Sequence, residues 1–316
     1  MASLFTKETL PTSSEEAIRR FDERHLAVIA AAKASGWADA FIAEVDAPRT
    51  TFPLSAFTSG FRETKEESGR FRGMSDKTFD VNVVEFDDGY EAKLFDILSN
   101  VFAWQRWQEA ASEFVASEAR HHAKELVALL EAGTSTLCSY DNVNFFSTAH
   151  LCNPMDAGSS TFSNYQATPA APETLTNIQT EMTNMRLVKD VNGDKLGVEP
   201  DEIWLPTQKF QKVSDALNKD NLASGESNTL KGQIKPVHVP ELTDADDWYL
   251  VDSKMMKKFV PMIAAKCSMF DAQLGLRFLD QNSDHFKKTG KIAVSKHIWA
   301  GYGLLFPHAI RLIKGA

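Results

Sequence analysis

The chain has 316 residues, of which 43% are hydrophobic and 24% are charged, and its formal net charge at pH 7 is −9. A chain of this length can bury about three quarters of its unfolded surface, which predicts one large globular domain or two modest ones. The negative net charge argues against a protein that binds nucleic acid over its whole surface, because such binding requires Lys and Arg to neutralise phosphates. A local basic patch is compatible with this charge.

The three cysteines, Cys138, Cys152 and Cys267, are odd in number and too few for a disulfide framework, which indicates a reducing compartment. The amino-terminal residues contain no apolar core of signal-peptide length. No window approaches the roughly 18 apolar residues of a membrane span. We therefore expect a soluble protein made in the cytosol.

The first part of the chain has helical periodicity. Ser13 and Glu16 form a capping-box pattern, and apolar residues follow at steps of three and four as far as Ala32. This pattern predicts an amphipathic helix over residues 14–35 that ends at Gly36.

Residues 50 to 100 have the pattern of β-structure. Phe79, Val81 and Val83 alternate with polar residues in TFDVNVVEF, after a charged middle segment and before a predicted DDG turn at 87–89. The pattern predicts a long two-stranded hairpin with too few apolar residues for a core of its own. Because isolated hairpins are marginal in water, this one needs another surface to lie on.

The strongest helix pattern covers about 102–132 and ends at Gly133. Its apolar stripe, which Glu118 breaks once, consists of Trp104, Trp107, Ala111, Val115, Ala119, His122, Leu126 and Leu129. At about 1.5 Å per residue, this helix would span about 45 Å and could serve as a spine. Residues 168 to 250 then alternate short helices and strands.

None of the polar clusters has the spacing of a known catalytic or metal site. His121, His122 and Glu125 match neither H-E-x-x-H nor H-x-x-E-H, which favours a helix-surface pair with a solvated carboxylate. The DADD run at 244–247 lacks the spacing and the glycine of a calcium loop, which favours a solvated turn. We therefore predict no catalytic residue, no cofactor and no metal ion.

The stretch SYDNVNFFSTAHLCNP begins at position 139 and gathers several reactive side chains. An enzyme could use Asp141, His150 and Cys152, but proximity in sequence is weak evidence for a catalytic pair, and a buried thiol is favoured. Asp141 and Asn142 suit a tight turn because Asn tolerates the left-handed region, and the two phenylalanines would pin the next segment to a core. His150 could hydrogen-bond a carbonyl group. We interpret the stretch as a structural clasp after the long helix.

The same stretch resembles the YDGxNFFxTxHP segment of the major head subunit of Mu-like tailed phages. The matching residues are Tyr140, Asp141, Asn144, Phe145, Phe146, Thr148 and His150. The resemblance continues in order over about residues 50–316, to a GYG ending formed by Gly301, Tyr302 and Gly303. In three departures, Asn142 replaces the usual turn glycine, Ala149 replaces an acidic residue, and the proline expected after His150 comes only at Pro154.

This resemblance implies an α+β protein with the Hong Kong 97-type capsid fold. Residues 1–48 would form the N-terminal arm, 49–98 the extended E-loop hairpin, 99–165 with 265–300 the peripheral domain with the spine helix, and 166–264 with 301–316 the axial domain. Phe79, Val81 and Val83 would then lie in an intersubunit loop. In such shells, the arm and the loop lie across neighbouring subunits.

The implied function is structural: a major capsid protein that self-assembles into pentamers and hexamers of an icosahedral phage or phage-like head enclosing DNA. The expected partners are further copies of the chain, a separate scaffold protein, a maturation protease, a portal and, in some heads, a decoration protein. DNA would be packaged without sequence-specific binding, no membrane is involved, and the virion would be assembled in the host cytoplasm. Two alternatives stay open, namely a cytosolic enzyme that uses the Asp141, His150 and Cys152 cluster, and a non-capsid virion protein.

Overall fold

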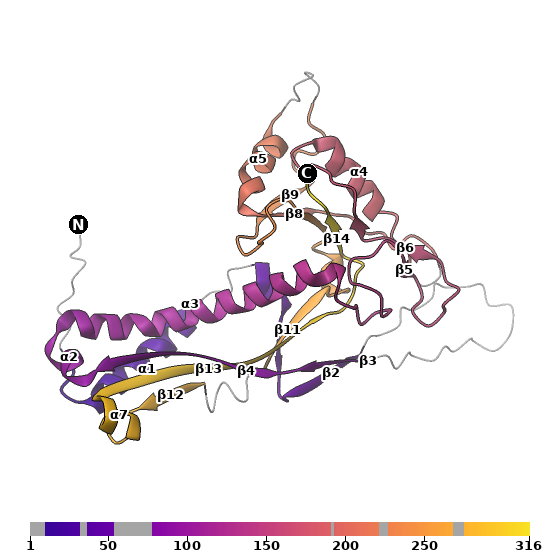
Figure 1. Ribbon diagram of the computed structural model, residues 1–316. Coiled ribbons are helices and arrows are strands. Elements are labelled where there is room, and N and C mark those ends of the chain that lie inside the picture. Colours follow the sequence, from indigo (N-terminus) through magenta and orange to yellow (C-terminus); the bar gives the residue numbers. More distant parts are fainter. Residues whose placement is uncertain (1–9, 32–36, 54–77, 191–192, 221–226, 268–274) are drawn as a thin grey trace. The chain divides into compact units, whose positions relative to one another are not determined.

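The structure is a computed structural model that describes residues 10–31, 37–53, 78–190, 193–220, 227–267 and 275–316 (Figure 1). The chain divides into two compact units. The first comprises residues 1–50, 82–123 and 264–301, and the second comprises 51–81, 124–263 and 302–316. None of the described helices combines the length and the apolar character needed to cross a membrane.

The first unit is built on a mixed sheet with the strand order β1-β11-β13-β12, and β4 also pairs with β13. The strands are β1 (Ile42–Val45), β4 (Val84–Lys93), β11 (Met262–Cys267), β12 (Leu276–Leu279) and β13 (Lys291–Leu304). The helices are α1 (Ser14–Ala31), the 3-10 helix η1 (Trp37–Phe41), α2 (Leu94–Ser99), α3 (Val101–Glu131) and α7 (Asp284–Thr289). β1 runs parallel to β11, whereas β4 and β12 run antiparallel to β13.

Helix α1 begins at the predicted cap. The Ser13 hydroxyl accepts a hydrogen bond from the Glu16 backbone N–H at 3.2 Å, while the Glu16 carboxylate reaches back to the N–H of Thr12 at 2.7 Å, one residue before the expected partner. Further along the helix, the buried Phe21 ring packs against Trp107, with centroids 5.4 Å apart. The capping-box prediction is confirmed, and the described helix ends at Ala31.

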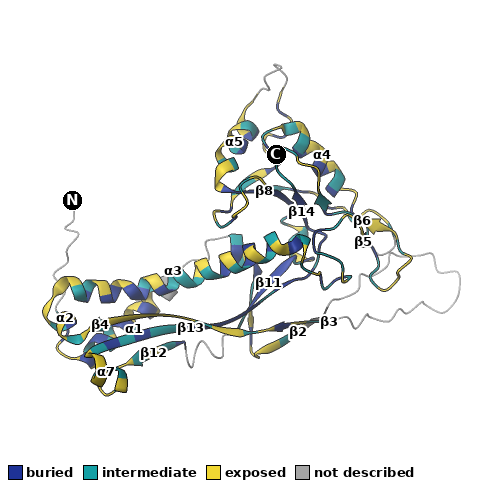
Figure 2. Ribbon diagram, viewed as in Figure 1, coloured by how far each residue is buried: buried dark blue, intermediate teal, exposed yellow. Residues whose placement is uncertain are grey.

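The predicted spine helix is confirmed as α3, which starts one residue earlier than expected. Figure 2 shows buried and exposed residues alternating along it, as an amphipathic helix requires. Ala119, which was placed on the apolar stripe, is exposed, so this part of the prediction is wrong. Phe114 and Leu130 are buried although the predicted stripe omits them.

The predicted two-stranded hairpin is confirmed at its base, whereas the strand that follows it, β4, pairs with β13. β2 (Arg49–Pro53) pairs with β3 (Thr78–Asn82), and residues 54–77, the polar middle, lie outside the described residues. The predicted DDG turn is wrong, because 87–89 lie inside β4, which pairs with β13 over ten residues. A Cβ atom at Gly89 would lie 3.3 Å from the Val294 carbonyl oxygen, so the glycine allows close approach within this ladder.

The three residues expected in the intersubunit loop differ in their surroundings. Val81 is buried within its own chain, and Phe79 and Val83 are half-buried. The Phe79 ring occupies the place where a Cβ atom of Gly303 would stand, since that atom would lie 2.4 Å from two ring carbons. The apolar face of β3 therefore packs on its own chain, and its opposite face carries the exposed Thr78, Asp80 and Asn82.

The second unit contains a five-stranded sheet with the order β7-β14-β10-β8-β9. The strands are β7 (Tyr165–Gln166), β8 (Glu202–Leu205), β9 (Lys235–His238), β10 (Trp248–Val251) and β14 (Ile310–Ile313), and β5 (His150–Leu151) pairs separately with β6 (Thr161–Phe162). The helical segments are η2 (Ala132–Thr134), α4 (Leu175–Met185), α5 (Thr207–Asn218) and η3 (Met255–Lys257). The short helices and strands predicted for the middle of the chain are confirmed at β8, α5 and β10.

The boundaries of the compact units agree only in part with the expected domain limits. The divisions at 263/264 and 301/302 lie within one residue of the expected limits, whereas those at 50/51, 81/82 and 123/124 do not coincide with the limits expected at 48/49, 98/99 and 165/166. Compactness alone does not define a functional domain. The assignment of the arm, loop, peripheral and axial parts therefore stays a prediction.

Candidate functional site

The segment that carries the sequence motif, residues 137–151, follows α3 directly, and we call it the motif loop. Its backbone doubles back on the end of the helix, because Phe146 donates its N–H to the Gly133 carbonyl at 2.9 Å and Phe145 donates to Thr136 at 2.9 Å. Cys138 and Val143 close the tip of the loop through a 2.7 Å bond. The motif loop thus continues the spine helix as a tightly bonded turn.

The turn at the tip has the predicted left-handed residue. Asn142 has a φ of 61°, and among the described residues it is the only non-glycine residue with positive φ. The preceding Asp141 organises the loop with both carboxylate oxygens. Its Oδ1 accepts the Val143 N–H at 3.2 Å, and its Oδ2 accepts the Leu151 N–H at 3.1 Å.

The His150 ring is fully buried at the base of this turn. Its Nδ1 lies 2.9 Å from Asp141 Oδ2, and its Nε2 lies 3.0 Å from the Phe145 carbonyl oxygen, so the predicted carbonyl bond is present. Burial alone would raise the pKa of Asp141, but the hydrogen bond and charge of His150, helped by the two backbone donors, hold that pKa below its usual range. The pair ties the two ends of the motif loop together.

The geometry gives no support to a His–Cys catalytic pair. Both ring nitrogens of His150 are bonded to oxygen atoms, so neither is available to take the proton of the Cys152 thiol. The Cys152 thiol is buried and accepts a hydrogen bond from Ser160 Oγ at 3.4 Å, while Tyr140 donates its hydroxyl to the Cys152 carbonyl at 2.7 Å. Cys138 and Cys152 are both free and buried, so they form no disulfide.

Phe145 and Phe146 pin the motif loop to the core, as predicted. Both rings are buried and meet edge to face, with centroids 4.9 Å apart. The Phe146 ring also packs on Tyr249 of β10 at 5.8 Å. A Cβ atom at Gly133 would lie 2.7 Å from a Phe146 ring carbon, so the glycine that ends the long helix leaves space for this ring.

Of the other motif residues, Asn144 has a structural contact and Thr148 is exposed. Asn144 donates its side-chain N–H to the Thr134 carbonyl at 2.7 Å.

The GYG residues Gly301, Tyr302 and Gly303 lie in β13, and the next two residues contact the motif loop. The Leu304 and Leu305 carbonyls accept hydrogen bonds from the Ser139 hydroxyl at 3.2 Å and the Cys138 thiol at 3.1 Å.

Two buried residues that support the motif loop have no signal in the sequence. The Asn164 side chain donates to the carbonyls of Phe145 and Pro307, at 2.8 and 3.2 Å, and accepts the Ser147 N–H. The His308 ring packs on Phe162, with centroids 4.6 Å apart, and burial lowers the pKa of His308 to about 3. Each of them has a partner at least 143 residues away in the chain, so no local pattern could identify them.

The other candidate clusters fall into different environments from those predicted. His122 is buried beside Glu118, at 4.0 Å, and burial lowers the pKa of His122 to about 4, so the predicted helix-surface pair is wrong at this residue. Asp247, expected in a solvated turn, is buried and bonded to Lys314 at 2.5 Å. Across the described residues, no group of three or more His, Cys, Asp or Glu side chains is placed to hold a metal ion.

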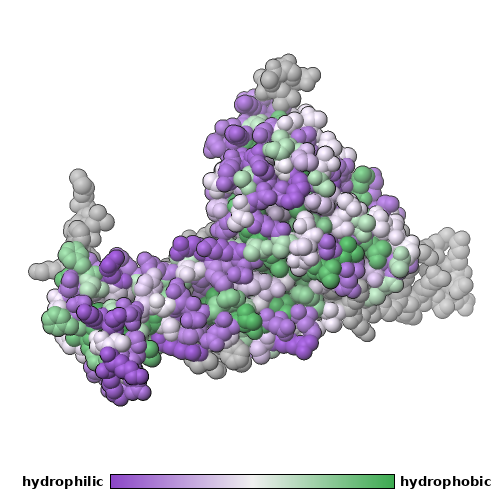
Figure 3. All heavy atoms as spheres, viewed as in Figure 1, coloured by the Kyte–Doolittle hydropathy of each residue, from purple (hydrophilic) through white to green (hydrophobic). Residues whose placement is uncertain are grey.

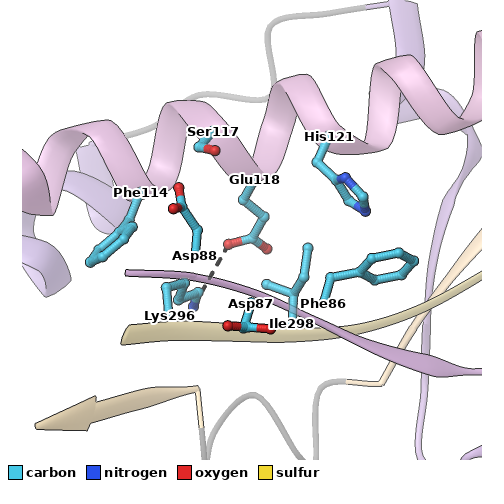
Figure 4. Close-up of a pocket in the computed structure, with 9 residues that line it drawn as sticks. All are labelled: Phe86, Asp87, Asp88, Phe114, Ser117, Glu118, His121, Lys296 and Ile298. Carbon is cyan, nitrogen blue, oxygen red and sulfur yellow. Dashed lines mark ion pairs between the residues drawn. The ribbon is translucent and has the colours of Figure 1, made fainter. Parts of the chain in front are cut away.

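A cavity of about 260 Å³ lies in the first unit between α3, β4 and β13 (Figure 4). Phe86, Phe114 and Ile298 are among its lining residues, and Glu118 points toward Lys296, whose Nζ lies 3.7 Å from Oε2. Lys266 of β11 also bonds Glu118. Burial would raise the pKa of Glu118, but the two lysines outweigh it and lower that pKa. This explains the acidic residue that interrupts the apolar stripe.

Comparison with known proteins identifies the family. Residues 71–175 and 170–242 match the model of the Mu-like prophage major head subunit gpT family, so the match runs from 71 to 242 and covers more than half of the chain. No curated protein matches the chain.

Similar solved structures are capsid subunits. The capsid of a native GTA particle has 14% identity and a TM-score of 0.53, with 100% of this chain and 94% of that chain covered. The procapsid of bacteriophage JBD30 has 14% identity and a TM-score of 0.51, with 96% and 75% covered. The virus-like particle from Pyrococcus furiosus has 9% identity and a TM-score of 0.50, with 94% and 98% covered.

These likenesses establish the architecture as the Hong Kong 97-type capsid fold in an α+β chain. Together with the family match over 71–242, this fold defines the class of protein as a phage shell subunit. The chain belongs to the family of Mu-like prophage major head subunits. It is a major capsid protein, a structural component of the virion whose copies assemble into the shell.

Proposed function

We propose that the chain assembles into pentamers and hexamers that close an icosahedral head around DNA. The family match over 71–242 carries this proposal, and the capsid fold across almost the whole chain supports it. Rings of five or six copies need heterologous contacts between the neighbouring copies within each ring. The net charge of −9 is compatible with DNA that is packed inside the shell without sequence-specific binding to its wall.

The motif loop serves this function as a structural clasp and not as an active site. Its reactive side chains are engaged in holding the loop on the end of α3, with His150 bonded to Asp141 and to the Phe145 carbonyl. The alternative of an enzyme that uses Asp141, His150 and Cys152 requires a free base beside the thiol, which this arrangement does not offer. We infer that the chain has no catalytic role.

The remaining proposals concern the partners of the shell. We assign assembly to the host cytoplasm, with a separate scaffold protein, a maturation protease, a portal and, in some heads, a decoration protein. The segment 49–98 is assigned to contacts between subunits. Because Val81 packs inside its own chain, the exposed face of β3 with Thr78, Asp80 and Asn82 is the part of this strand that a neighbour can cover.

The experiment that tests this function is size-exclusion chromatography with negative-stain imaging of the purified chain, alone and with its scaffold. Rings, tubes or irregular shells are expected without the scaffold, and uniform closed shells with it. A chain that remains a small species under all these conditions would refute the proposal. The Cys152→Ser variant should assemble as the wild type does, and a loss of assembly on this minimal change would contradict the clasp interpretation.

A further inference from the structure

The corner where α2 meets α3 exposes a cluster of large apolar side chains. The side chains of Phe95, Phe102 and Val101 are 78%, 67% and 42% exposed. Figure 3 shows light green side chains at the end of the first unit where Figure 1 labels α2. Single exposed apolar residues are ordinary, but two phenylalanines and a valine at one corner indicate a surface that a partner covers.

The backbone of this corner is anchored to the core of the first unit. Ile97 of α2 and Trp104 of α3 are buried in the core of the first unit. Asn100 joins the two helices, because its backbone N–H donates to the Asp96 carbonyl at 2.8 Å and its side chain accepts the Phe102 N–H at 2.9 Å. The structure thus presents the phenylalanines outward on an ordered support.

The rim of the corner carries charges of both signs. Lys93, Asp96 and Arg106 are exposed, and within the described part of the chain none of the three forms an ion pair. An apolar centre flanked by unpaired positive and negative groups is self-complementary, since the acidic group of one copy can face a basic group of another. This charge pattern favours a second copy of the chain as the partner.

We propose that this corner, defined by Phe95, Val101 and Phe102 with Lys93, Asp96 and Arg106 at its rim, binds the same corner of a second copy in the assembled shell. The proposal rests on the proposed function, because it names one of the contacts through which the copies assemble. Contact would remove the exposed rings from water and pair Asp96 of each copy with Lys93 or Arg106 of the other.

The first test replaces both rings in the variant Phe95→Ser/Phe102→Ser. The free variant should unfold at the wild-type temperature, because both side chains are exposed in the free subunit, whereas its assembled fraction at a fixed concentration should fall at least tenfold. Leu187→Ser is the matched control, since Leu187 is 51% exposed in the second unit and should assemble normally. Wild-type assembly by the double variant would overturn the proposal.

The second test distinguishes a second copy from any other partner. Asp96→Lys and the double variant Lys93→Asp/Arg106→Asp should each assemble poorly alone, and an equimolar mixture should recover most of the assembly, because opposite charges again face each other. Failure of the mixture to recover would show that the corner binds something other than this chain.

If wild-type shells form while every variant also assembles, only this inference fails. A wild type that never assembles would refute the proposed function and this inference together.

Discussion

Gly133, just after the end of α3, lies against the Phe146 ring of the motif loop, which makes Gly133→Ala a direct test of the clasp. The added methyl carbon would lie 2.7 and 2.9 Å from two ring carbons of Phe146, and 3.4 Å from Phe145. Carbon atoms do not approach each other below about 3.0 Å, so the Phe146 ring would have to move. The ring has little room to do so, because it is 2% exposed and packs on both Phe145 and Tyr249.

The size of the effect follows from this overpacking. Forcing an extra methyl group into a filled core costs about 1 to 3 kcal/mol. The backbone at Gly133 is outside the left-handed region, so alanine introduces no strain in φ and the whole cost is steric. We therefore expect Gly133→Ala to lower the free energy of unfolding by about 2 kcal/mol, a large fraction of the stability of a typical domain.

The assay is urea unfolding of the free subunit, followed by tryptophan fluorescence. Gly158→Ala is the matched control, because a Cβ atom there meets only Asp156 Oδ1 at 3.3 Å in an exposed loop, and it should change stability by less than about 0.5 kcal/mol. In a Phe146→Leu background the side chain that faces the added methyl group is smaller, so Gly133→Ala should lower the free energy of unfolding by less than it does in the wild type. An unchanged stability of Gly133→Ala, or an equal cost in both backgrounds, would refute the reasoning.

Three further predictions concern single residues. Phe145→Ala should cost about 3 to 5 kcal/mol in urea unfolding and reduce the soluble yield, because the ring is fully buried. Asn142→Gly should preserve stability, whereas Asn142→Val should lower it by about 1 to 3 kcal/mol, because the φ of 61° disfavours a β-branched residue; equal stabilities would contradict this. His122 has its pKa lowered by burial to about 4, so the unfolded chain binds the proton first as the pH falls. Stability should therefore decrease between about pH 6.5 and 4 by about 3 kcal/mol, and His122→Leu should remove that part of the decrease in unfolding experiments.

The elements that follow local rules could be predicted from the sequence. The cap at Ser13, the long helix and the left-handed turn at Asn142 depend on residues close together in the chain, and the structure contains all three. The buried phenylalanine pair belongs to the same category, since burial of two adjacent aromatic side chains after a turn is strongly favoured over their exposure to water. Such features are visible in a single segment because their physical cause lies in that segment.

Features that depend on distant pairing could not be predicted. The DDG segment was expected to turn, but the ladder with β13 keeps 87–89 extended. Glu118 seemed to interrupt an apolar face because its lysine partners come from β11 and β13, 148 residues or more further along the chain. Asn164 and His308 support the motif loop through contacts that likewise exist only in the folded chain. In each case, the sequence shows one member of a pair and the fold supplies the other.

The departures from the family segment can now be understood from the geometry of the motif loop. Asn142 adopts the left-handed conformation for which the family uses glycine, so the turn is kept. Ala149 is exposed, and the bonds of the His150 ring go to Asp141 and to the Phe145 carbonyl, so the missing acidic residue leaves no ring nitrogen of His150 unsatisfied. Leu151 stands where the family has proline, which has no N–H to donate, and its N–H adds a 3.1 Å bond to Asp141. This chain therefore stabilises its loop with a backbone donor at a position where the proline of the segment that it resembles would provide none.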